Sequence, residues 1–221
     1  VEDAIYERRS NRLFSKEPLP DDLVRRVVEA GRFAPSHGNN EPWSFIIINN
    51  DREQIQKIAD MMDPLYRFLA SFYFSGKRNH LMRKLLALSS FFVPPLLDQR
   101  AMTGGKSILK PRDVFLGANC LIYILGDKRG INDVSVDCGI CGQNMVLAAH
   151  SLGLVTCYLS FAAVGATMLP WVKKYLGIKW PYKPITALVM GYPRVNADSV
   201  VKRELPRITW RRGGKTWTEM P

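Results

Sequence analysis

The chain has 221 residues, of which 47% are hydrophobic and 23% charged, so its length and composition fit a globular domain with its own core. Its formal charge of +11 attracts anions without selecting among nucleic acids, acidic membrane surfaces and phosphorylated cofactors. The longest apolar stretch, residues 85–97, is too short and too often interrupted by Ser and Pro to span a membrane. The four cysteines do not form a secreted disulfide pattern, so we expect reduced thiols and a cytoplasmic protein.

No repeat or linker divides the sequence, and we therefore treat residues 1–221 as one domain. Apolar residues at helical spacing behind an Asp pair predict a helix over residues 21–33. A loop rich in Pro, Gly and Asn follows, and the run WSFIIIN predicts a buried strand over residues 43–49. A helix is expected at residues 51–61. The aromatic-rich residues 63–111 are expected to form two helices and a flexible connection.

Three further apolar runs predict buried strands at residues 119–125, 154–159 and 183–191. Helices are expected between them, at residues 137–152 and 168–176. The chain after residue 191 is polar and basic, and we expect a tail there. This order predicts a helix-rich α/β or α+β fold whose central sheet is covered on both faces.

The first candidate site is the basic run Arg8–Arg12 (RRSNR), which holds three guanidinium groups and two short hydrogen-bonding side chains. Arg suits bidentate phosphate binding, and Ser adds a compact donor. The alternative is a solvated basic turn, because charge clusters usually lie on the surface.

The second candidate site is the loop Ala34–Trp43 (APSHGNNEPW), between a predicted helix and a predicted strand. Loops at strand edges commonly bind ligands in layered proteins. Gly38 lets the backbone approach a flat ligand, and Asn39 offers both a donor and an acceptor to a heteroaromatic ring. The alternative is a tight helix-to-strand connection without a ligand.

These two segments combine with GQNMVLAAHSLGL at residues 142–154 and PITALVMGYP at residues 184–193. In this order and spacing, the four motifs resemble the nitroreductase family of flavoproteins. The resemblance implies an α+β sandwich with a central mixed, mainly antiparallel sheet flanked by helices. It also implies an intertwined homodimer that binds FMN at the subunit interface, and residues 62–113 then correspond to a lid or insertion.

The resemblance further implies which residues contact FMN. Those around the phosphate and the ribityl chain are Arg8, Arg9, Ser10 and Arg12. Those that approach the isoalloxazine ring, from the partner subunit, are Pro35, Ser36, His37 and Asn39. Leu159 and Ser160 match the place where backbone groups pass the reactive face of the flavin. Lys202 or Arg203 matches the basic residue that closes over the phosphate.

The activity implied is hydride transfer from NADH or NADPH through flavin N5 to a nitroaromatic, quinone or related small acceptor, by a ping-pong mechanism. The sequence has no G-x-G-x-x-G motif for a separate dinucleotide site, and a ferredoxin-like protein is an alternative electron donor. No catalytic side chain is assigned. An aromatic lid would use Phe68, Phe72 and Phe74, although these residues also fit two core-packed helices.

Glu41 departs from the family pattern, which commonly has Gln before the Pro-Trp pair. An ionised Glu41 near the flavin would disfavour the anionic reduced ring, unless it pairs with an Arg or points away. Cys138 and Cys141 have the spacing of a redox or zinc pair but lack a second ligand pair, so core packing is expected and no metal is assigned.

Two other classes of function remain open. One is a specialised flavoprotein on the same fold, performing reductive dehalogenation or flavin fragmentation. The other is a basic nucleic-acid-binding protein. The sequence carries no nucleic-acid-binding motif, and we expect neither a nucleic-acid nor a membrane partner.

Overall fold

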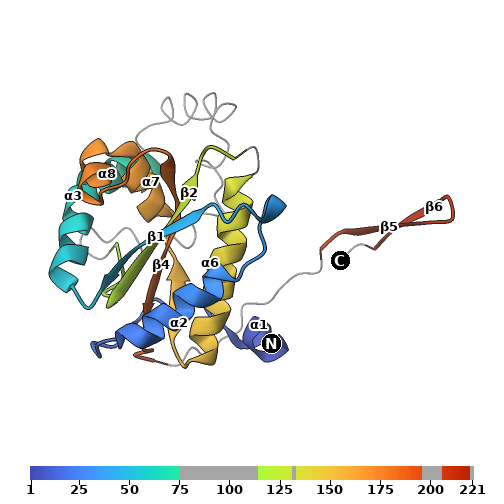
Figure 1. The fold of residues 1–221 in the computed structure, drawn as a ribbon, viewed down its shortest axis with the longest axis horizontal. Helices are drawn as coiled ribbons and strands as arrows, with labels where there is room; N and C mark the ends of the chain where they lie inside the picture. Colours follow the sequence, from blue (N-terminus) through green and yellow to red (C-terminus); the bar gives the residue numbers. More distant parts are fainter. Residues whose placement is uncertain (75–113, 131–132, 196–205, 220–221) are drawn as a thin grey trace.

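A computed structural model describes residues 1–74, 114–130, 133–195 and 206–219 (Figure 1). Its centre is a sheet of four strands: β1 (Trp43–Asn49), β2 (Cys120–Asp127), β3 (Val155–Tyr158) and β4 (Tyr182–Gly191). The strands lie in the order β1-β2-β4-β3, and every neighbouring pair is antiparallel. All four predicted strands are therefore confirmed, with ends that differ by at most two residues.

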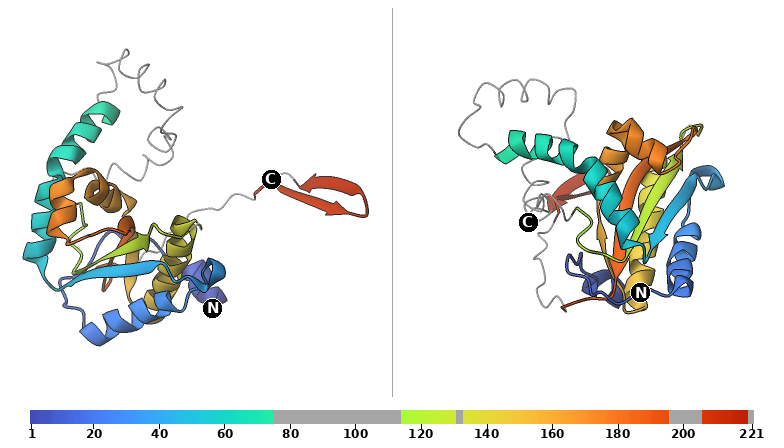
Figure 2. Two further views of the ribbon diagram at one scale, coloured as in Figure 1. Left: turned by 45° about the horizontal axis from the view of Figure 1, so that its top comes forward. Right: turned by 90° about the vertical axis from the view of Figure 1, so that its left-hand side faces the viewer.

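Helices cover both faces of this sheet (Figure 2). On one face lie α2 (Asp21–Arg32) and α6 (Val134–Ser151), which pack side by side. On the other lie α3 (Arg52–Phe74), α7 (Ser160–Met168) and α8 (Pro170–Tyr175). The arrangement confirms the predicted α+β fold.

Strand β2 shows how one sequence supplies both halves of the core. Its side chains alternate across the sheet, as strand geometry requires. Leu121, Tyr123 and Leu125 belong to the cluster under α3, α7 and α8. Cys120, Ile122 and Ile124 belong to the cluster under α2 and α6. Because both faces are covered, residues 120–125 of β2 (CLIYIL) are all hydrophobic.

The structure corrects the sequence predictions in three places. The helix expected at residues 51–61 continues as α3 to Phe74. Helix α7 was not expected, and the helix predicted at residues 168–176 is the shorter α8. The prediction of a tail after residue 191 is wrong for its last part, because residues 208–219 form a hairpin of β5 (Ile208–Arg212) and β6 (Lys215–Glu219).

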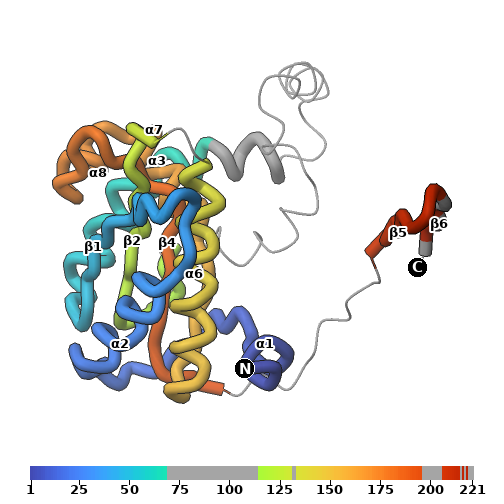
Figure 3. Tube along the Cα trace, turned by 45° about the vertical axis from the view of Figure 1, so that its right-hand side comes forward, coloured from blue at the N-terminus to red at the C-terminus, as the bar shows by residue number. Residues whose placement is uncertain are grey.

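This hairpin turns at Gly213 and Gly214, whose φ angles are 57° and 75°. Two left-handed residues in a two-residue loop are the geometry that matches the twist of a hairpin, and glycine adopts it without a steric cost. The hairpin stands away from the rest of the structure (Figure 3). In the described part of the chain, no helix is both long and apolar enough to cross a membrane.

Candidate functional site

The basic run near the N-terminus lies along the edge strand β3. It follows the short helix α1 (Glu2–Glu7). Ser10 forms a parallel bridge with Thr156, and the Asn11 N–H donates to the Thr156 carbonyl at 3.0 Å. The buried Asn11 side chain fixes the next turn, since its Oδ1 accepts from the Leu13 N–H at 2.8 Å and its Nδ2 donates to the Val195 carbonyl. The sequence neighbours of Asn11 are thereby held against the sheet.

Two guanidinium groups of this run contain buried donors. Arg9 Nη1 donates to the carbonyls of Tyr6 and Arg8, at 2.5 and 2.9 Å. The Nε atoms of Arg8 and Arg9 are buried, and no acceptor among the described residues pairs with either. A buried N–H without an acceptor is costly, so an acceptor for either donor would stabilise this arrangement. Ser10 and Arg12 are exposed beside them.

The positive charges of this basic run influence the pKa values of side chains at the end of β3. Burial raises the pKa of the Cys157 thiol, and Arg12 partly opposes that rise. Burial likewise raises the pKa of Tyr158, with Arg8 opposing. The run therefore adds positive potential where β3 leads into α7.

The second predicted segment is the loop between α2 and β1. Its centre is a short 3-10 turn, η1 (His37–Asn39). The His37 N–H donates to Asp137 Oδ1 at 3.2 Å, and the Glu41 N–H donates to Ser36 Oγ at 2.9 Å. Gly38, Asn39 and Glu41 all have positive φ, at 61°, 54° and 42°. Such a backbone is sparsely populated outside glycine, so the two side-chain acceptors hold the loop in an unusual shape.

The predicted ring-contacting side chains occupy this loop in different ways. Pro35, His37 and Asn39 are exposed, whereas Ser36 is half-buried and already accepts from Glu41. A Cβ at Gly38 would meet no atom within 4 Å. Glycine is therefore favoured at that position by its left-handed backbone rather than by crowding within this chain.

The third predicted element is the junction between β3 and α7. The Leu159 side chain is buried, and its N–H donates to the Ala187 carbonyl at 2.8 Å. Ser160 is exposed and begins α7. In the first turn of α7 the Ala162 N–H donates to the Leu159 carbonyl at 2.9 Å, and the N-cap Leu159 has no capping side chain. The backbone N–H groups that precede Ala162 are therefore the donors that this junction offers to a ligand.

The structure thus brings two of the predicted groups, Arg8–Arg12 and Leu159–Ser160, to the same strand, β3, and attaches the loop to α6. The predicted phosphate-closing residues, Lys202 and Arg203, lie outside the described residues. Of the predicted lid, Phe68 on α3 is 57% exposed, while the side chains of Phe72 and Phe74 lie outside the described part. Tyr66, at the start of the aromatic segment, belongs instead to the core.

Sequence reasoning missed Asn11 and Asp137, which hold the two predicted binding segments in place. Asp137 could have been noticed as a carboxylate at the start of a predicted apolar helix. Its partner His37 is 100 positions away in the sequence, and no local pattern predicts that contact.

The structure bears on two questions that the sequence left open: the surroundings of Glu41 and the role of the two neighbouring cysteines. Glu41 is exposed. The pKa of Arg32 is raised mainly by its hydrogen bond to Glu29, and to a smaller degree by the charge of Glu41. Cys138 and Cys141 are free and fully buried, and burial raises the pKa of each thiol to about 12. Both thiols are protonated at neutral pH, as core residues are.

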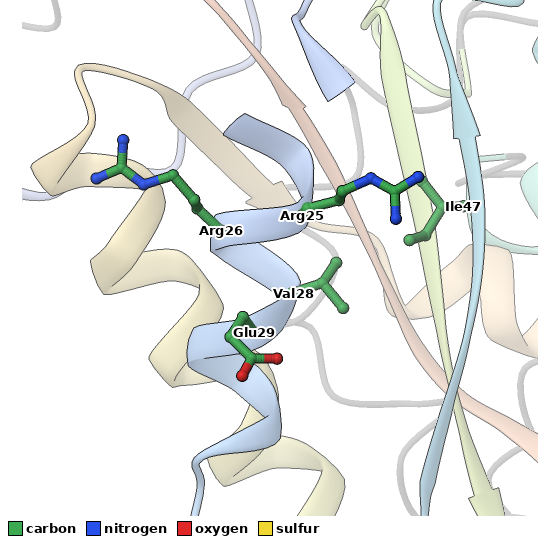
Figure 4. Close-up of a pocket in the computed structure, with 5 residues that line it drawn as sticks. All are labelled: Arg25, Arg26, Val28, Glu29 and Ile47. Atoms are coloured by element: carbon green, nitrogen blue, oxygen red, sulfur yellow. The ribbon is translucent and has the colours of Figure 1, made fainter. Parts of the chain in front are cut away.

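A separate hollow lies between α2 and the edge strand β1 (Figure 4). It is lined by Arg25, Arg26, Val28, Glu29 and Ile47. Arg25 extends toward Ile47, whereas Arg26 points away on the other side of α2. None of these residues belongs to the predicted FMN positions, so the hollow is distinct from the candidate flavin site.

A four-stranded antiparallel sheet between two helical layers, with a basic segment along its edge, defines an α+β protein of the nitroreductase type. The chain belongs to the nitroreductase family, whose pattern it matches over residues 5–192.

Individual relatives agree with this assignment. Nitrobenzene nitroreductase of Ectopseudomonas oleovorans is 27% identical over 228 residues, covering 95% of each protein. Iodotyrosine deiodinase 1 of Rattus norvegicus is 33% identical over 194 residues, which are 86% of this chain and only 60% of the deiodinase. A crystal structure of a nitroreductase with bound FMN from Desulfitobacterium hafniense DCB-2 aligns with a TM-score of 0.64 at 22% identity, over 91% of this chain and 93% of that one.

Proposed function

We propose that the protein is an FMN-dependent oxidoreductase that uses NADH or NADPH to reduce a nitroaromatic, a quinone or a related small acceptor. The observation that carries the proposal is the pair of buried Nε donors of Arg8 and Arg9 beside the edge strand β3, for which the described residues provide no acceptor. Bound FMN would supply the chemistry, taking a hydride at its N5 position and passing it to the acceptor in a ping-pong cycle.

The residues of the basic run fit the phosphate of FMN. A phosphate dianion accepts several charge-assisted hydrogen bonds, and guanidinium groups are the side chains that best match its geometry. Arg8 and Arg9 would supply their buried Nε donors, while Ser10 and Arg12 would add exposed ones. We assign Lys202 or Arg203 to closing over the same phosphate.

The loop and the start of α7 fit the flavin ring. The exposed Pro35, His37 and Asn39 would contact the ring, with Ser36 keeping the loop closed. The first turn of α7, after Leu159 and at Ser160, would place backbone donors and the positive end of a helix dipole near it. Such donors stabilise negative charge that develops on reduction.

We propose a homodimer with FMN at the subunit interface, in which the loop serves the flavin of the partner. Two features support it. Helix α6 exposes Val136 (55%) and Ile140 (37%) although its other side is in the core. The hairpin of β5 and β6 stands away from the body, and a two-stranded hairpin by itself is only marginally stable in water. A partner subunit would cover both surfaces.

We also propose that residues 1–221 form one FMN-binding domain in the cytoplasm. Residues 62–113 would carry the lid, and the exposed Phe68 supports that role. A ferredoxin-like donor stays as the alternative to NAD(P)H.

The test is the visible absorption spectrum of the purified protein after addition of FMN, before and after anaerobic NADH or NADPH. A bound-flavin spectrum that bleaches with either nucleotide supports the proposal. A bound flavin that does not bleach rejects NAD(P)H as the donor and favours a ferredoxin. Failure to bind FMN would overturn the proposed function.

The second candidate is a specialised reaction on the same fold, such as reductive dehalogenation or flavin fragmentation. The 33% identity to a deiodinase over 86% of this chain favours the first of these. A panel of nitroaromatic, quinone and halogenated aromatic acceptors separates the candidates. Activity confined to the halogenated compounds would replace the nitroreductase proposal.

A further inference from the structure

Asp137 is a buried carboxylate whose position folding alone does not explain. It lies in the first turn of α6, only 4% exposed. Its Oδ1 accepts from the His37 N–H, but its Oδ2 is buried and pairs with no donor among the described residues. Burying a polar oxygen without a hydrogen-bond donor costs free energy.

Helix α6 does not need this carboxylate for its own start. Asp133 already caps the helix, because its Oδ1 accepts from the Ser135 N–H at 2.9 Å. The hydrogen bond that the Asp137 side chain accepts is instead directed across the fold, from a backbone N–H of the loop. The contribution of Asp137 is therefore a hydrogen bond that holds the backbone of that loop in place.

The loop needs such control, because its backbone is strained. Asn39 and Glu41 have left-handed φ angles, which cost a non-glycine residue on the order of 1 kcal/mol or more. Within the loop, the Ser36 hydroxyl accepts a hydrogen bond from the Glu41 N–H. From outside the loop, the Asp137 carboxylate accepts one from the His37 N–H. Without the second acceptor, the loop could relax toward ordinary backbone angles.

We propose that Asp137 is a positioning residue: by holding the His37 N–H it keeps Pro35–Asn39 in the shape required to contact the flavin ring. The link to flavin rests on the function proposed above, whereas the link to the loop rests on the hydrogen bond alone. Asn at this position would keep an Oδ1 acceptor for the His37 N–H, whereas Ala would remove it.

The experiment compares Asp137→Ala and Asp137→Asn with a matched control, Asp133→Ala, which damages the same helix end without touching the loop. Amide hydrogen exchange is followed in the FMN-free proteins over residues 34–43, and FMN affinity is measured separately by flavin fluorescence. Exchange in the loop should rise at least tenfold in Asp137→Ala, less in Asp137→Asn, and not in Asp133→Ala. The FMN dissociation constant should rise in the same order, by about tenfold in Asp137→Ala.

The outcomes separate this proposal from the proposed function. Unchanged loop exchange in Asp137→Ala overturns the positioning role, as does an equal rise in Asp133→Ala, which would reveal a general effect on α6. Faster exchange with unchanged FMN affinity overturns the link between this loop and the flavin. If the wild-type protein binds no FMN, the proposed function fails, and the exchange data alone still decide whether Asp137 holds the loop. Should Asp137→Ala not fold, Asp137→Asn carries the same comparison.

Discussion

The N-terminal basic run and the C-terminal hairpin both carry Arg residues, but the first is packed against the central sheet and the second is exposed. Residues 8–14 are attached to the sheet by backbone bonds to Thr156 and by Phe14, which is buried in the core. In the hairpin, every residue of β5 is exposed. The difference teaches that charge alone does not build a binding site. An arginine becomes a specific anion ligand when neighbouring apolar and amide groups fix it and exclude water from it.

The strongest test of this contrast is the removal of one aromatic ring from each region. Phe14→Ala should lower the free energy of unfolding by about 3 kcal/mol, because a buried ring leaves a cavity beside Gly191 and the core. Trp210→Ala, at a residue that is 48% exposed, should lower it by less than about 1 kcal/mol. Urea unfolding of both variants provides the measurement. Equal losses would mean that the hairpin is as much a part of the folded core as residue 14.

The amide anchor of the N-terminal run should have the next largest effect. Asn11→Ala leaves the Leu13 N–H and the Val195 carbonyl without their partner, so we expect a loss of about 1–3 kcal/mol in the free energy of unfolding. Asn40→Ala is the control, because Asn40 is exposed and has ordinary helical backbone angles. The same urea titration compares the two, and a loss in Asn40→Ala as large as that in Asn11→Ala would contradict the anchoring role.

The functional side of the comparison rests on two arginines. Arg8→Ala removes a buried donor assigned to the FMN phosphate and should raise the FMN dissociation constant about tenfold. Arg211→Ala removes the same charge from the exposed hairpin and should change it less than about twofold, since exposed charges are screened. Fluorescence titration with FMN measures both. A larger effect at Arg211 would move the phosphate site to the hairpin.

The smallest expected effect concerns the hairpin turn. Gly213→Ala places a Cβ at a φ of 57°, which costs about 1 kcal/mol in the hairpin only. Exchange of backbone amides in residues 208–219 should accelerate, while urea unfolding of the body stays within about 0.5 kcal/mol of wild type. A decrease in the stability of the body would show that the hairpin packs on it in solution.

How much the sequence predicted depended on the range of the interactions. Apolar runs such as WSFIIIN and NCLIYIL are local signals, and both strands were placed within two residues. Helix α7 was missed because its Ala- and Gly-rich sequence has no polar face to give a helical period. The hairpin was missed because overall polarity outweighed the Gly-Gly pair between two alternating stretches, which is the more specific signal.

In the candidate site, too, the local motifs could be found from the sequence, whereas the long-range contacts could not. Local motifs selected Arg8–Arg12 and the loop at residues 34–43 as candidates, with a solvated basic turn and a plain helix-to-strand connection as the alternatives. The resemblance to the nitroreductase family, rather than the residue types alone, assigned these segments to FMN. The contacts that hold these segments join distant positions, such as Asp137 with His37 or Asn11 with Val195. Such pairs depend on how the helices and strands pack, and that packing is not encoded in any single stretch of sequence.

Strand β1 has a consequence for handling the protein. In the described part of the chain, β1 has a hydrogen-bonded neighbour on one side only, and Ile47 is 41% exposed beside it. An apolar strand with a bare edge is a template for pairing with other chains. We therefore expect variants in which this edge is further exposed to precipitate as the protein concentration rises. Light scattering during purification would detect that failure earlier than any assay of activity.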